Sequence, residues 1–189
     1  MDKLSELNCV SEARAASLLT PLIERAPGLA RHVAARRPFK SADDLRQAIR
    51  SELLALGEAE RLSLFRAHPE LAPENPLSMT NESRSEQARL NLTSDKNEYR
   101  ARLGELNEKY RDKFGFPFIT ALVRHQDIDS VLIEFEARLL ADRESEIERA
   151  IDQIATVSSS RVSEIFGCAS LDRTEDLAMH GMADRDYGG

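Results

Sequence analysis

The sequence contains no tryptophan, only eight glycines, and two cysteines among 189 residues. The two cysteines, Cys9 and Cys168, are far apart and match no metal-binding or disulfide pattern, which indicates a reducing, cytoplasmic setting. No apolar run approaches the roughly 18 residues of a membrane-spanning helix. The polar N-terminus has no apolar signal-peptide core. We therefore expect a cytoplasmic protein with no membrane partner.

The chain also lacks a block of lysine and arginine residues, and its formal net charge is −7. Proteins that follow a phosphate backbone carry a basic patch, so no nucleic-acid partner is expected. Clusters of His, Cys, Asp and Glu with metal-ligand spacing are missing, as are glycine-rich phosphate loops. The sequence therefore predicts no metal site and contains no phosphate-binding loop.

What the sequence does contain favours helices. Apolar residues make up 41% and charged residues 31% of the chain, which is typical of a globular protein. Ala, Leu, Glu and Arg dominate, and all four favour helices. We predict an all-α fold, a single compact domain of about eight helices with short loops over residues 1–166. A polar, flexible tail is expected over residues 167–189.

Capping residues, prolines and glycines divide the chain into these helices. Pro21 is expected to bend or split the first helix, and Gly57 to end the third. Arg36-Arg37-Pro38-Phe39 is expected to end the second. The expected helices begin at Ser11, Pro27, Ser41, Glu58, Ser83, Ser94 or Asp95, Asp127, and Arg143 or Glu144.

The stretch around His68 organises the rest of the chain. A residue before proline is disfavoured in the right-handed helical region, so one helix should stop near Ala67 and leave His68 extended. Downstream, Ser83 and Glu86 have the spacing of a capping box. Two helix ends that face each other across a loop would bring His68 and Glu86 together. Capping alone, and a structural His, are the plainer explanations. They are compatible with a functional one, because a fixed carboxylate can orient an imidazole.

Residues 116–123 form an apolar run that is too short for a confident helix assignment and has a proline in second place. We predict a buried extended segment. Its backbone N–H and C=O groups need hydrogen-bond partners, and a bound ligand is one source of them. A plain core connector is the alternative, since periodicity alone does not distinguish the two.

Arg161 stands where the last helix is expected to place an apolar residue. It is either a snorkelling residue at the margin of the stripe or a cation turned into a polar pocket. An unpaired buried charge is very costly, so the second case needs an anionic side chain or ligand. The stripe reads Ile147, Ile151, Ile154, Ser158, Arg161, Ile165.

Three segments together resemble the OHCU decarboxylase family, whose members convert 2-oxo-4-hydroxy-4-carboxy-5-ureidoimidazoline (OHCU) to (S)-allantoin in urate breakdown. The resemblance covers residues 7–166 and implies an all-helical, cofactor-free enzyme that forms a homodimer. Arg36-Arg37-Pro38-Phe39 and Arg161 add to it. The segments are His68-Pro69-Glu70-Leu71-Ala72, Ser83-Arg84-Ser85-Glu86-Gln87, and the stretch from Leu106-Asn107 through Tyr110 and Lys113 to Phe118-Ile119.

The resemblance also implies roles for individual residues. His68 would be the catalytic acid/base, Glu86 would orient its ring and favour the protonated form, and Arg161 would hold the anionic substrate with a fork of donors. His125 is a second polar candidate whose context gives no support for catalysis. The expected substrate contacts are Pro69, Ser83, Arg84, Ser85, Gln87, Phe118, Ile119, Thr120, Ala121 and Leu122.

The chain departs from the family pattern in two places. Ala88-Arg89-Leu90 and Arg124-His125-Gln126 stand where relatives often carry glycine, and we expect both changes to alter pocket edges or assembly contacts more than the chemistry. Two alternatives stay open. One is a non-enzymatic all-helical interaction module, which predicts an exposed apolar groove and no convergent polar cluster. The other is the same fold acting on a related ureido or hydantoin acid.

Overall fold

The computed structural model describes residues 2–93 and 99–167, and over these ranges it contains helices and no strand. The all-α prediction is confirmed, with nine α-helices in the described residues. None of these helices is long and apolar enough to cross a bilayer. The α-helices are α1 (Lys3–Cys9), α2 (Glu12–Leu19), α3 (Pro27–Ala35), α4 (Ala42–Ala55), α5 (Glu58–Ala67), α6 (Asn81–Arg89), α7 (Arg100–Phe114), α8 (Ile128–Leu139) and α9 (Arg143–Phe166), and the 3₁₀ turns are η1 (Thr20–Leu22), η2 (Pro76–Ser78) and η3 (Leu122–Arg124).

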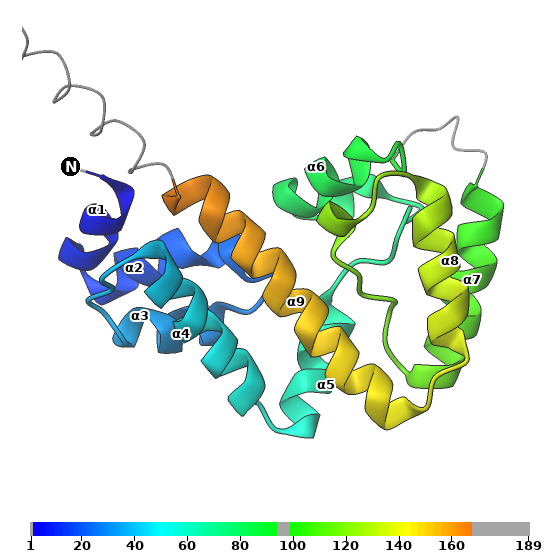
Figure 1. The fold of residues 1–189 in the computed structure, drawn as a ribbon, viewed down its shortest axis with the longest axis horizontal. Coiled ribbons are helices and arrows are strands. Elements are labelled where there is room, and N and C mark those ends of the chain that lie inside the picture. Colours follow the sequence, from blue (N-terminus) through cyan, green and yellow to red (C-terminus); the bar gives the residue numbers. More distant parts are fainter. Residues whose placement is uncertain (1, 94–98, 168–189) are drawn as a thin grey trace, which may run out of the picture.

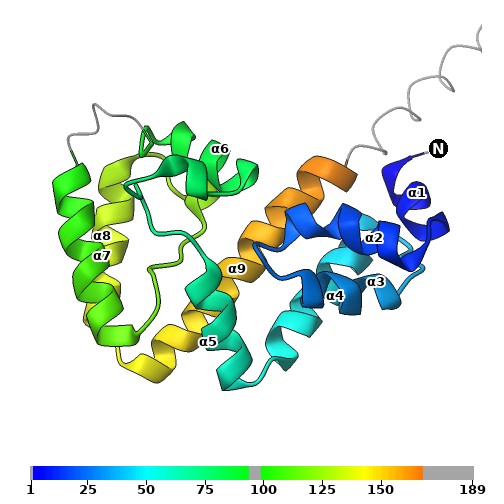
Figure 2. The ribbon, with the colours of Figure 1, turned by 180° about the vertical axis from the view of Figure 1, so that it is seen from behind.

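Helix α9 is the longest element, at 24 residues, and it runs diagonally through the middle of the molecule (Figure 1). Helices α1 to α4 lie on one side of it, and α6, α7 and α8 lie on the other (Figures 1 and 2). Its predicted apolar stripe is buried at Ile147, Ile151 and Ile154. Helix α9 therefore contributes core residues to both halves of the fold.

Most of the expected helix boundaries are confirmed. Ser11 and Ser41 cap α2 and α4 through their side chains. Helix α2 ends at Leu19, and Pro21 lies in the turn η1 that follows it. His68 has an extended backbone (φ −73°, ψ 145°) at the end of α5. Helix α1 was not predicted, because seven residues are too few for a periodic apolar pattern. The expected caps Ser94 and Asp95, and the expected tail from residue 168 onward, lie outside the described residues.

The predicted start of α6 at Ser83 is wrong. Thr80 is the N-cap, and its hydroxyl accepts a hydrogen bond from the Ser83 backbone N–H. A threonine three residues earlier performs the same capping function, so the Ser83 hydroxyl is not needed at the helix end. It is buried and points toward Glu24 instead.

Gly115 ends α7 in the left-handed region (φ 80°) and turns the chain into residues 116–121. Residues 117–121 are irregular in structure, and residues 116–122 are buried. The predicted run is buried and non-helical over residues 117–121. Its end was predicted wrongly, because Leu122 and Val123 belong to the turn η3 and Val123 is exposed. Below, residues 118–122 are called the wall segment.

Two glycines, one within α7 and one at its end, give a matched test of this geometry. Gly115→Ala forces a side chain into the left-handed region and should lower the free energy of unfolding by about 1 kcal/mol. Gly104 is exposed within the helix, and a methyl group added to it would meet nothing within 4 Å. Gly104→Ala should therefore raise the same quantity by up to about 1 kcal/mol. Urea unfolding measures both changes, and effects of equal sign would contradict this description of the α7 end.

Candidate active site

A cleft lies between α5, α6, α9 and the wall segment. Its lining combines a convergent set of polar side chains with an apolar surface, the usual make-up of a small-molecule site. The polar residues are Glu24, His68, Ser83, Glu86, Gln87, Thr120, Ser158 and Arg161, and the apolar ones are Leu22, Pro69, Leu71, Phe118, Ile119, Leu122, Ile154 and Val157.

Arg161 is the central cation of this cleft. It is 4% exposed, and its guanidinium faces two carboxylates. Nε and Nη2 bind the two oxygens of Glu86 at 2.8 and 2.9 Å. Nη1 donates to the Pro21 carbonyl at 3.0 Å and to Glu24 at 3.3 Å. Burial alone lowers the pKa of Arg161, but Glu86 and Glu24 outweigh it and raise that pKa. The interpretation of Arg161 as a cation turned into a polar pocket therefore fits the structure, and the interpretation as a snorkelling residue does not.

These contacts correct the expected division of roles. Glu86 was expected to orient the His68 ring, but its carboxylate binds Arg161 with both oxygens. Arg161 was expected to offer a fork of donors to the substrate. Its four contacts with protein acceptors leave at most one of five guanidinium N–H groups for a ligand. The sequence did not show this, because Glu86 and Arg161 are 75 positions apart.

His68 takes its orientation from its own helix. Its Nδ1 lies 2.8 Å from the Leu64 carbonyl. A carbonyl only accepts, so Nδ1 carries the proton and Nε2 is the free nitrogen in the neutral ring. Burial lowers the pKa of His68, the Leu64 carbonyl and Glu24 act against this, and Arg161 and Arg25 add to it. The expected protonated ring is therefore not favoured: the cleft lowers this pKa and favours a neutral imidazole.

Gln87 holds the loop that follows His68. Its side-chain amide donates to the Glu70 carbonyl at 2.9 Å and accepts from the Ala72 N–H at 2.8 Å. Asn107 donates to the Leu71 carbonyl at 2.9 Å. This loop carries Pro69, which lines the cleft. Gln87 thus lies in the cleft as predicted, and most of its hydrogen bonding maintains the loop.

Some of the remaining predicted substrate contacts line the cleft, and others do not. Phe118, Ile119, Thr120 and Leu122 line the cleft. Ala121 is fully buried, and its N–H donates to Gln153. Arg84 and Ser85 are absent from the lining; Arg84 binds Asn81 within its helix, and Ser85 borders an adjoining surface groove that shares Glu86 and Arg161 with the cleft.

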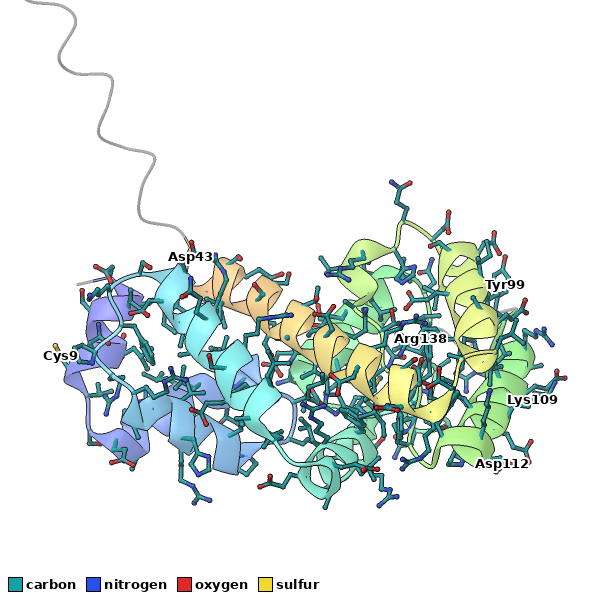
Figure 3. All side chains as sticks on the ribbon, turned by 60° about the horizontal axis from the view of Figure 1, so that its bottom comes forward. Cys9, Asp43, Tyr99, Lys109, Asp112 and Arg138 are labelled. Atoms are coloured by element: carbon teal, nitrogen blue, oxygen red, sulfur yellow. The ribbon has the colours of Figure 1, made fainter. Side chains whose placement is uncertain are left out.

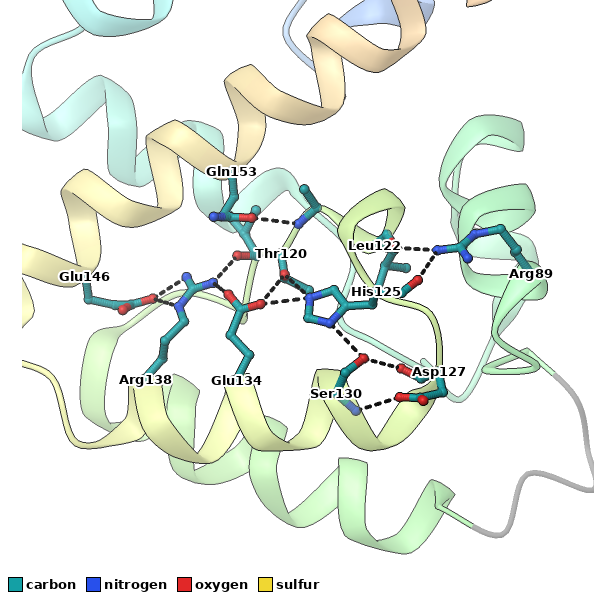
Figure 4. A network of polar contacts seen from close by, with 12 residues as sticks. Arg89, Thr120, Leu122, His125, Asp127, Ser130, Glu134, Arg138, Glu146 and Gln153 are labelled. Carbon is teal, nitrogen blue, oxygen red and sulfur yellow. Dashed lines mark hydrogen bonds and ion pairs between the residues drawn. The ribbon is translucent and has the colours of Figure 1, made fainter.

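Arg89 and His125, from the two departures from the family pattern, meet in the structure. Arg89 donates to the carbonyls of Leu122 and His125 (Figure 4). Neither residue lines the cleft, and both support one end of the wall segment. The expectation that these departures affect the edges of the pocket is consistent with this placement.

Glu24 is the cleft residue that the sequence analysis missed. It is 5% exposed and accepts hydrogen bonds from the hydroxyls of Thr80 and Ser83 at 2.9 Å. The available signal was its position directly after two apolar residues, Leu22 and Ile23. A carboxylate at such a position needs a partner, but nothing local identifies that partner as a residue 137 positions away.

Comparison with known proteins agrees with this arrangement. The family model described as "OHCU decarboxylase" matches residues 8–163. The chain belongs to the OHCU decarboxylase family. The resemblance seen in the His68, Ser83 and Phe118 segments is thereby confirmed at the level of the family.

Individual relatives cover most of the chain. A protein of Haloferax volcanii named 2-oxo-4-hydroxy-4-carboxy-5-ureidoimidazoline decarboxylase is 31% identical over 163 residues, 86% of this chain and 95% of the relative. A protein of Mus musculus with the same name is 34% identical over 79% of this chain and 84% of the relative. A crystal structure of OHCU decarboxylase in the presence of (S)-allantoin has a TM-score of 0.61 at 21% identity, covering 74% of this chain and 91% of that one, which supports the fold.

The environment of His68 predicts an acid-shifted titration. In an NMR titration, the midpoint of the His68 ring should lie below the usual 6.5, and Glu24→Gln should move it lower still, because the Glu24 charge raises that pKa. Glu74→Gln, in an exposed loop, is the matched control and should leave the midpoint unchanged.

The lowered pKa of His68 also makes the free energy of unfolding depend on pH. The unfolded chain takes up the His68 proton at a higher pH than the folded chain, so this residue lowers the free energy of unfolding as pH falls below about 6.5. A midpoint at or above 6.5, or one that Glu24→Gln raises, would show that the cleft does not favour the neutral ring.

Proposed function

We propose that this protein decarboxylates OHCU to (S)-allantoin, with His68 as the acid/base group in the cleft. The observation that carries the proposal is the convergence of His68, Glu86 and Arg161, from three different helices or helix ends, on one cleft. An interaction module would have no need for a buried and a half-buried carboxylate around a buried guanidinium beside a His. Membership of the OHCU decarboxylase family supports the same conclusion.

The substrate ring itself accepts the electron pair that is released when CO₂ is lost. Loss of CO₂ breaks the bond to the ring carbon that bears the hydroxyl, and the electron pair moves toward the neighbouring C=N bond. The ring nitrogen takes a proton from solvent, which gives an enol. Nε2 of neutral His68 then accepts the enol hydroxyl proton as the carbonyl forms, and a proton from Nε2 reaches the neighbouring carbon. Delivery from one face gives one enantiomer. Acid/base assistance of this kind contributes about 10²–10⁴-fold.

The carboxylates and the guanidinium have a different part in the reaction. With His68 neutral, Glu24 and Glu86 carry two negative charges and Arg161 one positive charge. The remaining Nη2 proton of Arg161 binds one substrate oxygen. Glu86, fixed by Arg161, accepts a hydrogen bond from a substrate N–H or hydroxyl group. The backbone N–H groups of Ile119 and Thr120 have no hydrogen-bond acceptor among the described residues and are available to the ring carbonyl oxygens.

We also propose that Pro69, Ser83, Gln87 and the wall segment contact the ring, and that Ser85 acts at the neighbouring groove that it borders. A homodimer is proposed from the family resemblance, and a cytoplasmic location from the two isolated cysteines. Analytical ultracentrifugation of the full chain tests the dimer, and a monomer at micromolar concentration would contradict it.

The decisive experiment generates the unstable substrate from urate in place and follows the handedness of the product by circular dichroism. The wild-type protein should give single-handed allantoin faster than the spontaneous reaction. His68→Asn should lower kcat by about 10²–10⁴-fold with an unchanged circular dichroism spectrum of the fold. Racemic product at the spontaneous rate with wild-type protein would refute the proposed function, and faster turnover of a related hydantoin acid would redirect it to that substrate.

Arg161→Lys tests the planar guanidinium. A lysine ammonium cannot bind both Glu86 oxygens, the Pro21 carbonyl and Glu24 together, so kcat/KM should fall by about 10²-fold or more. Arg50→Lys, at an exposed ion pair with Asp152, is the control and should keep kcat/KM within about twofold. Near-native activity of Arg161→Lys would mean that a point charge is sufficient there.

A further inference from the structure

A second buried ion cluster lies behind the cleft, and the proposed chemistry does not use it. Its centre is Arg138 on α8, which is 1% exposed. Figure 3 shows Arg138 in the interior near α9, whereas Lys109 and Asp112 of α7 extend outward. A buried cluster of this kind does not by itself stabilise a fold more than well-packed apolar residues would, so the question is what Arg138 does there.

Three contacts connect Arg138 to successive residues of the wall segment. Its Nη1 donates to the Ile119 carbonyl at 2.8 Å. Its guanidinium carbon lies 4.5 Å from the centre of the Phe118 ring. Through Glu134, which it binds at 2.8 Å, it reaches the Thr120 hydroxyl, which donates to Glu134 at 3.1 Å (Figure 4). Phe118, Ile119 and Thr120 all line the cleft.

The guanidinium itself is held in place from the opposite side. Nε donates to Glu146 at 2.8 Å, and Nη2 binds the same carboxylate oxygen. Glu146 is fully buried and also accepts from the Tyr110 hydroxyl. Because α7, α8 and α9 each supply one of Tyr110, Arg138 and Glu146, the plane of the guanidinium is fixed by three helices.

Glu134 carries this constraint to Thr120. Burial raises its pKa, but the ion pair with Arg138 outweighs burial and lowers that pKa, so the carboxylate stays an acceptor for the Thr120 hydroxyl. His125 Nε2 lies 2.8 Å from the same carboxylate oxygen and 3.2 Å from the Thr120 hydroxyl. The Thr120 side chain is thereby tied to α8 and does not turn freely in the cleft.

We propose that Arg138 is a positioning residue for substrate binding: its guanidinium fixes Phe118, Ile119 and Thr120 so that this stretch of irregular backbone presents its free amide groups to the substrate. This inference rests on the proposed function. Residues 117–121 have no helical hydrogen bonds of their own, so side chains must determine where their backbone lies. Arg138 contacts two of the cleft-lining members, Phe118 and Ile119, from behind.

A positioning role for Arg138 predicts which kinetic constant changes when this residue is replaced. If the wall segment only shifts, the substrate interactions that weaken are those made equally in the ground state and the transition state, so KM rises and kcat changes little. Loss of the cation alone would be repaired by lysine. Loss of the planar fork would not be, because one ammonium group cannot bind Glu146, Glu134 and the Ile119 carbonyl in their present places.

The test compares Arg138→Met and Arg138→Lys with the wild-type full chain. KM for substrate, and Kd for (S)-allantoin by calorimetry, should rise about tenfold in both variants, as expected when one or two hydrogen bonds are misaligned. The value of kcat should stay within about threefold. Arg37→Met is the matched control. Arg37 also donates to three part-buried backbone carbonyls, those of Leu7, Val10 and Ala34, but it does not line or support the cleft.

An unchanged KM in Arg138→Met, a native KM in Arg138→Lys, or an equal rise of KM in Arg37→Met would each overturn the proposal. If Arg138→Met does not fold, Glu134→Gln decides. This variant keeps the Arg138–Glu146 pair and loses an acceptor for Thr120, and Glu134 is 27% exposed. It should raise KM about threefold with a native melting temperature, and an unchanged KM would overturn the proposal. Absence of decarboxylation by the wild type would instead refute the proposed function.

Discussion

The buried guanidinium of Arg161, set between Glu86 and Glu24, is the interaction on which the cleft depends. It connects the end of η1, the middle of α6 and the last third of α9 through four hydrogen bonds. Removing one partner of such a cluster leaves a buried charge uncompensated, which typically costs about 3–5 kcal/mol. The position of α6 against α9, and with it the opening of the cleft, therefore depends on charges that are distant in sequence.

The cleft is built where helices end. His68 follows α5, Pro69 and the loop to Leu71 follow it, and the wall segment follows α7. Irregular backbone leaves amide groups free for a ligand, but it needs to be held by something other than its own hydrogen bonds. Here Gln87 holds the loop after His68, and Arg138, Gln153 and Arg89 hold the wall segment. Two sets of polar side chains thus serve one site, one facing it and one behind it.

Local chemistry made much of this predictable. A proline after His68 was sufficient to place that residue in extended backbone, and Pro21 was sufficient to end α2. Arg161 could be recognised because it interrupts an apolar stripe. Prediction failed where two neighbouring residues could perform the same local function, and where two residues that are distant in sequence pair with each other. Thr80 and Ser83 are both able to cap α6, and both hydroxyls donate to the buried Glu24 carboxylate, so local sequence does not show that Thr80 is the cap. Likewise, the spacing of Glu86 gives no indication that Arg161 rather than His68 is its partner.

The length and position of α9 have a consequence for synthesis of the protein. Domains begin to form as the chain leaves the ribosome, N-terminal parts first. Helices α1 to α6 and the turns between them contain Glu24 and Glu86, yet the guanidinium that pairs with both belongs to the final turns of the last described helix. Until that stretch emerges, the two nascent carboxylates lack their guanidinium partner. The cleft can therefore close around them only after the part of α9 that carries Arg161 has been made.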